Sequence, residues 1–164
     1  MNLASRRSHP LFRAILTSGI LAGTIDIGAA CLINERSVAF ILHTIAGGLL
    51  AQRSYSGGAF TATLGLILQW AMSILIAAVY IYAARFREVL RRRWISLGIC
   101  YGAVIFVVMN YVVVPLSAWR VVPKFSTQLF LENLAAMFVF GLIVAGSAGR
   151  LSEKCWHTLT TTER

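Results

Sequence analysis

The amino-acid sequence predicts an all-α integral membrane protein, built as a bundle of four transmembrane helices with one additional short helix. Of its 164 residues, 58% are hydrophobic and 13% are charged, and the mean hydropathy is +0.74. Soluble domains are about 45–50% apolar and about 25% charged. The apolar residues also form long blocks, which a bilayer requires. These observations exclude a disordered chain and argue against a water-soluble domain.

Four apolar blocks have the length that a membrane-crossing helix needs, which is about 17–25 residues. They cover residues 14–33, 60–84, 94–118 and 129–148. A fifth block, residues 38–51, is too short to cross the bilayer unaided. We expect it to form a re-entrant or interfacial helix between the first and second spans. The whole chain, residues 1–164, is then a single membrane domain.

The first block has an alternative interpretation as a signal peptide. Ser5, Arg6 and Arg7 precede it as in a twin-arginine signal, and Gly28 to Cys31 resembles a lipoprotein cleavage site. The block is longer than the apolar core of a signal peptide, which is about 7–15 residues, and it contains Asp26. We therefore expect a retained first helix.

The basic residues predict the orientation in the membrane. Eleven lie before the first span, between the second and third, or after the fourth: Arg6, Arg7, Arg13, Arg85, Arg87, Arg91, Arg92, Arg93, Arg150, Lys154 and Arg164. Four lie on the other side: Arg36, Arg53, Arg120 and Lys124. The positive-inside rule then places both termini in the cytoplasm. The net charge of +9 thus reports topology rather than a nucleic-acid partner. The arginines around residues 85–93 are expected to contact anionic lipid headgroups.

Small residues recur at helical spacing along the predicted spans, and they allow membrane helices to pack closely. In the first span the stripe contains Gly19, Gly23, Asp26 and Ala30, and in the second Gly65, Gln69, Ser73 and Ala77. The third span contains Gly98 and Gly102, and the fourth Glu132, Ala136 and Gly146. A tightly packed bundle accounts for all of these residues.

Polar residues on these helices are the candidate site. Asp26, Gln69 and Asn110 lie at matching depth, roughly 10–14 Å below the membrane surface opposite the termini. Glu132 is shallower, and His43 lies in the short helix, which could fold over this end of the bundle. A charged group in hydrocarbon normally faces the bundle interior with a partner. Asp26 should therefore be hydrogen-bonded to Gln69 or Asn110, or else be protonated. For His43 the alternative is a single hydrogen bond to a backbone carbonyl or a headgroup.

No catalytic motif is present in the sequence. Cys31, Cys100 and Cys155 have no spacing typical of a disulfide framework or a zinc site. We therefore expect no enzymatic activity, no metal and no cofactor.

Three segments resemble a group of small uncharacterised bacterial inner-membrane proteins, distantly similar to the YagU-like family. They are residues 19–30 with Asp26, residues 42–48, and residues 101–117. The resemblance covers roughly residues 12–150, and its motifs are short and hydrophobic. It implies a four-helix protein of the bacterial inner membrane and supplies no functional residue. Relatives often carry a histidine where this chain has Gln69, which argues against a proton relay at that position.

Two functions remain open from the sequence. The first is a transporter-like or ion-coupled bundle with a polar site around Asp26. Four spans are few for a transporter, so this function implies a homo-oligomer, most simply a homodimer. The second is a structural or accessory membrane protein whose intramembrane polar residues only fix helix packing. Water access to Asp26 discriminates between them. An intramembrane enzyme acting on lipid is a third possibility, but the sequence offers no nucleophile–base pair.

Overall fold

The computed structural model describes the backbone of residues 3–123 and 125–161 and the side chains of residues 11–123 and 125–149. This part of the chain is helical and contains no strand. In chain order its elements are α1 (Leu3–Asn34), α2 (Val38–Leu50), the 3-10 helix η1 (Ala51–Ser56), α3 (Gly58–Phe86), α4 (Glu88–Arg92), α5 (Trp94–Val108), the π-helix η2 (Met109–Val113), α6 (Val114–Leu116) and α7 (Thr127–Thr161).

Four helical segments are long and apolar enough to cross a membrane, which confirms the predicted fold class. They are Leu11–Asn34, Gly58–Phe86, Trp94–Leu116 and Thr127–Gly149. The third consists of α5, η2 and α6, which continue one another. Its π-helix ends at Val113, two residues before Pro115, whose nitrogen carries no hydrogen and cannot donate a helical hydrogen bond.

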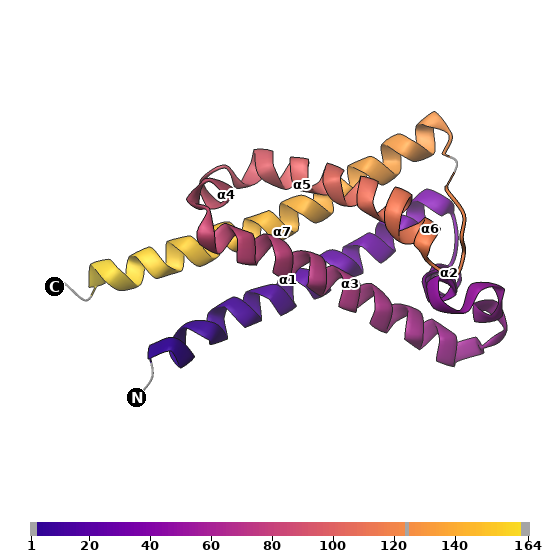
Figure 1. Cartoon of the computed structure of the whole chain (residues 1–164), viewed down its shortest axis with the longest axis horizontal. Coiled ribbons are helices and arrows are strands. Elements are labelled where there is room, and N and C mark those ends of the chain that lie inside the picture. The colour runs from indigo at the N-terminus through magenta and orange to yellow at the C-terminus, as the bar shows by residue number, and fades with distance from the viewer. Residues whose placement is uncertain (1–2, 124, 162–164) are drawn as a thin grey trace.

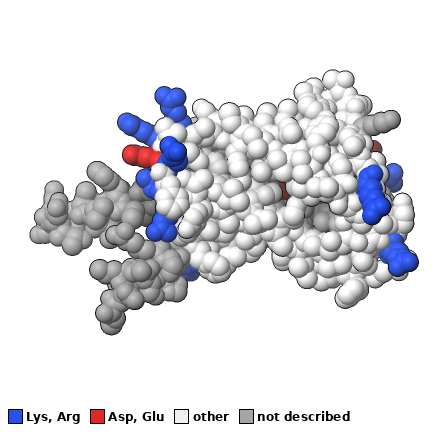
Figure 2. Space-filling view, viewed as in Figure 1, with Lys and Arg blue, Asp and Glu red and all other residues white. Residues whose placement is uncertain are grey.

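The four spans run between two ends of the molecule, as Figure 1 shows. The beginning of α1, the end of α7 and the short helix α4 lie at one end, called here the α4 end; α2 and α6 lie at the other, the α2 end. Figure 2 shows Lys and Arg side chains at both ends, with a broad band free of them between. Such a band is what a bilayer-crossing protein presents to lipid.

The helix α2 is the short element that the sequence predicts between the first two spans. Its N-cap is Ser37, whose Oγ accepts a hydrogen bond from the Phe40 amide at 3.3 Å. The chain reverses before it at Glu35, which has a positive φ of 52°. In Figure 1, α2 is seen nearly end-on, so it lies across the direction of the spans rather than along it. It packs on α3, and it is not among the described helices that are long and apolar enough to cross a membrane.

The helices do not pack as a symmetric four-membered ring. Within the described residues, α1 packs on α3 and α7, whereas α5 packs mainly on α7 and is not packed on α1. The main core lies in the half of the molecule near the α4 end, where α1, α3 and α7 meet. It comprises Ala22, Ala77, Tyr80, Ile81, Ala84, Phe140, Val144, Ala145 and Ala148. Towards the α2 end, the first turns of α3 and α7 diverge (Figure 1).

Glycines bring α5 and α7 into backbone contact. The predicted close approach at Gly98 and Gly102 is present, and the facing residue on α7 is Gly141. A methyl group on Gly102 would overlap the carbonyl of Met137, and one on Gly141 would overlap the carbonyl of Gly98. The sequence signal for this contact was incomplete, because Gly141 was not part of any predicted stripe.

Several residues used for the orientation lie outside the described side chains. They are Arg6, Arg7, Lys124, Arg150, Lys154 and Arg164, together with Cys155. The two cysteines within the described region, Cys31 and Cys100, are not joined in a disulfide.

Candidate functional site

The candidate site lies where α1 crosses α3. Small residues make the crossing close: Gly19 faces the backbone of Ile74, and Gly23 faces the side chain of Ser73. The same register brings Asp26 to Gln69, and the Gln69 Nε2 donates a hydrogen bond to the Asp26 Oδ2 at 2.7 Å. Of the two partners predicted for Asp26, the structure therefore contains Gln69.

A second polar contact connects the same two helices. The indole Nε1 of Trp70 donates a hydrogen bond to the Thr24 Oγ1 at 3.2 Å. The Thr24 hydroxyl itself donates to the carbonyl of Ile20 at 2.7 Å. The sequence analysis missed this pair. A signal was available, because Trp70 follows Gln69 and an indole N–H in an apolar span requires an acceptor.

The second carboxylate oxygen of Asp26 is not paired. Asp26 is half-buried, and its hydrogen bond to Gln69 engages only Oδ2. Among the described, non-exposed side chains, Arg91 Nε is the one fully enclosed polar atom without a hydrogen-bond partner. The Asp26 Oδ1 must therefore retain some accessible surface.

The other residues of the predicted polar layer do not join Asp26. Asn110 donates from Nδ2 to the carbonyl of Phe106 at 2.9 Å, within its own helix. The Glu132 Oε1 accepts from Gln128 Nε2 at 2.8 Å, also within one helix. The physical reason lies in the packing, since α5 contacts α7 rather than α1, and the start of α7 diverges from α3. Matching depth along separate helices was not sufficient to predict a shared cluster.

His43 makes the simpler of the two contacts expected for it. Its Nε2 donates to the carbonyl of Gly58 at 2.9 Å, which fastens α2 to the start of α3. Nearby, the amide of Ala118 donates to the carbonyl of Gly48 at 2.8 Å, and Trp119 Nε1 donates to the carbonyl of Thr44 at 3.1 Å. These bonds fix α2 across the α2 end, and none of them involves Asp26.

The described residues form a groove at the α4 end. It has a volume of about 1180 Å³ and lies between α1, α4 and α7. Asp26 does not line it. Within the described residues, no group of three His, Cys, Asp or Glu side chains is placed to hold a metal ion. The arrangement at Asp26 can hold one hydrogen bond between helices and offers one free acceptor.

Comparison with known proteins gives no relative: no protein-family model, curated protein or solved structure matches this chain.

Proposed function

We propose that this chain is an accessory multi-pass protein of the bacterial inner membrane, without enzymatic activity, in which the Asp26–Gln69 pair fixes the register of α1 on α3. The observation that carries this proposal is the 2.7 Å hydrogen bond between the two side chains, at a crossing already closed by Gly19 and Gly23. Asp26 does not line the groove at the α4 end, so that groove provides no water-filled path to it. A polar pair that locks packing needs no such path.

A double-mutant cycle tests the register role. Asp26→Ala, Gln69→Ala and the double variant are compared with the wild type for the free energy of unfolding in detergent micelles. We expect a coupling energy of about 0.6 kcal/mol and no more than about 1.7 kcal/mol, as for other polar pairs between membrane helices. The matched control is the cycle of Asp26→Ala with Asn110→Ala, which should show no coupling because the two side chains are not bonded. Equal coupling in both cycles would contradict the proposal.

The second candidate function is an ion-coupled homo-oligomer with Asp26 as the protonation or cation site. The unpaired Oδ1 of Asp26 favours it, because a carboxylate with a free oxygen can bind a proton or a cation. Proteoliposomes containing a pH-sensitive dye and subjected to a pH gradient test this function. Proton entry above that of protein-free vesicles would support it, and entry equal to theirs would remove it.

The proposed topology places both termini and α4 in the cytoplasm and α2 on the opposite side. Eleven of the basic residues are then cytoplasmic. Single cysteines introduced at Glu35, Tyr55 and Arg87 of a cysteine-free variant test this arrangement with a membrane-impermeant thiol reagent. We expect labelling of the first two positions from outside intact cells and of the third only after lysis. Labelling of positions 35 and 55 from different sides would mean that α2 crosses the membrane.

A further inference from the structure

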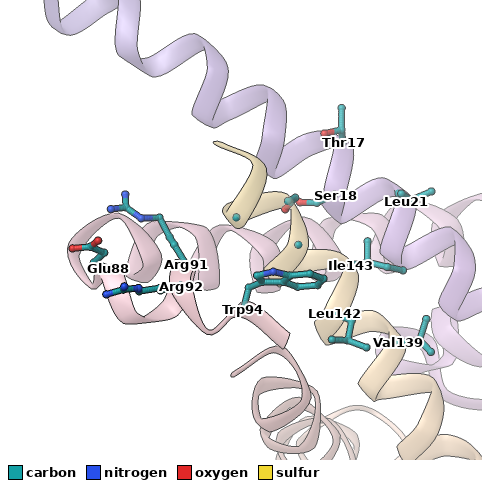
Figure 3. Close-up of a pocket in the computed structure, with 13 residues that line it drawn as sticks. Thr17, Ser18, Leu21, Glu88, Arg91, Arg92, Trp94, Val139, Leu142 and Ile143 are labelled. Carbon is teal, nitrogen blue, oxygen red and sulfur yellow. The ribbon is translucent and has the colours of Figure 1, made fainter. Parts of the chain in front are cut away.

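The groove at the α4 end combines charged and apolar walls. Figure 3 shows Glu88, Arg91 and Arg92 gathered at one end of it, and Leu21, Leu142 and Val139 at the other. The charged residues belong to α4, and the apolar ones to α1 and α7. The groove is partly open to its surroundings. Its lining therefore changes from cationic to apolar along its length.

Two local features shape this groove. The indole of Trp94 packs on α7 at Gly146 and Gly149, which have no side chains. A Cβ atom on Gly146 would lie 3.4 Å from the nearest indole atom, and one on Gly149 would lie 3.6 Å from it. The helix α4 is held in place by Tyr80, whose hydroxyl donates to the carbonyl of Leu90 at 3.2 Å. This hydrogen bond connects α4, which carries Arg91 and Arg92, to α3.

Arg91, which lines the groove, has one donor that no described residue satisfies. Its Nε is fully enclosed and has no hydrogen-bond partner among the described residues. Enclosing an unpaired donor of a charged group is costly, and such groups normally have a partner. Within the same part of the chain, neither Arg91 nor Arg92 is within ion-pair distance of Glu88, although all three line the groove. Among the described residues, no carboxylate therefore pairs with either guanidinium group.

The length of the groove matches one leaflet of a bilayer. Its wall on α7 extends from Gly149 to Val139, which is about 15 Å at 1.5 Å per residue. The hydrocarbon core of a bilayer is about 30 Å thick, so the groove reaches from the end of the span to the middle of the membrane. A ligand of this length that is anionic at one end and apolar along the rest is a phospholipid.

We propose that this groove binds one anionic phospholipid from the leaflet on the α4 side. Arg91 and Arg92 donate to the phosphate, and one acyl chain lies along Leu21, Leu142 and Val139. A soluble phosphate would leave the apolar walls unoccupied, whereas a phospholipid fills both parts. The site is separate from the Asp26–Gln69 pair, so its test can fail while the proposed register role stands.

Fluorescence of Trp94 reports the occupancy of this groove. The probe is a variant in which Trp94 is the one tryptophan left, with Trp70, Trp119 and Trp156 replaced by phenylalanine. It is reconstituted in bilayers containing phosphatidylglycerol or phosphatidylcholine with brominated acyl chains, which quench indole fluorescence on contact. We expect the site at Trp94 to prefer phosphatidylglycerol by about fivefold or more, the factor that one basic residue near an anionic leaflet gives. Circular dichroism and a thermal transition in detergent verify that each variant is folded.

Matched variants assign the preference to the groove. Arg91→Gln and the double variant with Arg92→Gln should reduce the preference towards one. Arg87→Gln removes the same charge next to α4 without touching the groove, and should leave the preference unchanged. Thr17→Phe adds bulk at the groove wall and should reduce quenching by both lipids.

Three results would overturn the proposal. The first is equal quenching by the two brominated lipids in the folded probe. The second is an equal loss of preference in Arg87→Gln and Arg91→Gln, which would indicate attraction by diffuse charge. The third is the absence of Trp94 quenching by either lipid in a protein that is dimeric in the same bilayers. A second copy of the chain would then fill the groove.

Discussion

Two close contacts between the membrane-crossing helices are made in different ways. Between α5 and α7, Gly98 and Gly102 meet Gly141, and within the described residues no side-chain hydrogen bond connects the two helices. Between α1 and α3, Gly23 meets the side chain of Ser73, and two side-chain hydrogen bonds follow. Hydrogen-bonded polar pairs contribute little to the free energy of helix association in membranes. Close backbone packing depends on small residues, and a larger side chain at the contact prevents it. Substitutions should therefore destabilise the contact of α5 with α7 more than that of α1 with α3. The polar pairs between α1 and α3 should instead determine the register in which these two helices pack.

The largest effect is expected at the glycine contact. Gly102→Leu inserts a side chain against the backbone of Met137 and Phe138, which cannot retreat without separating α5 from α7. We expect a loss of about 3 kcal/mol in the free energy of unfolding, at the upper end of overpacking effects. The measurement is unfolding in detergent micelles.

Gly28→Leu is the matched control for this substitution. A Cβ on Gly28 would meet nothing within 4 Å, so the new side chain would project into open space. The expected change is below about 0.5 kcal/mol. Similar stability of the two variants would show that the contact of α5 with α7 is not as described.

A smaller effect, and one that can be reversed, is expected at the contact of α1 with α3. Gly23→Ala places a methyl group against the Ser73 side chain, which should cost about 1–2 kcal/mol. Removing that side chain as well, in the double variant with Ser73→Gly, should restore most of this loss. Gly102→Ala offers no such repair, because its methyl group would meet the carbonyl of Met137. If the double variant is no more stable than Gly23→Ala, the methyl group at position 23 does not act through the Ser73 side chain.

The hydrogen bond from Trp70 to Thr24 should have a still smaller effect. Trp70→Phe removes the donor and keeps an aromatic ring, and Thr24→Val removes the acceptor. We expect each variant to lose about 0.6 kcal/mol, and the double variant to lose no more than either alone. Additive losses would mean that the 3.2 Å contact does not act as a hydrogen bond.

The sequence was sufficient to predict the helices but not their neighbours. Hydropathy and length determine where a helix can cross a bilayer, so the positions and lengths of the apolar blocks were enough to predict the four spans and the short helix at residues 38–51. Which helices touch depends on how surfaces fit in three dimensions. Asn110 illustrates this limit: its depth matches that of Asp26, yet α5 packs on α7 and Asn110 bonds to its own helix.

The site residues could be predicted where a polar residue lies on the same helix face as a run of small residues. Asp26 and Gln69 each continue a run of small residues, Gly19 and Gly23 on α1 and Ser73 on α3, and those runs face each other. The groove at Arg91 was not predictable in this way. It depends on Trp94 lying across Gly146 and on Tyr80 holding α4, and neither contact has a sequence pattern of its own.

The most direct test of the register role is the comparison of Asp26→Asn with the wild type. An asparagine side chain has nearly the same shape and can still accept the hydrogen bond from Gln69, but it cannot take up a proton or neutralise a cation. We predict a free energy of unfolding within about 0.5 kcal/mol of the wild type, and identical proton entry into proteoliposomes for the two proteins. A folded Asp26→Asn variant that abolishes a proton flux carried by the wild type would contradict the account and make Asp26 an ion site.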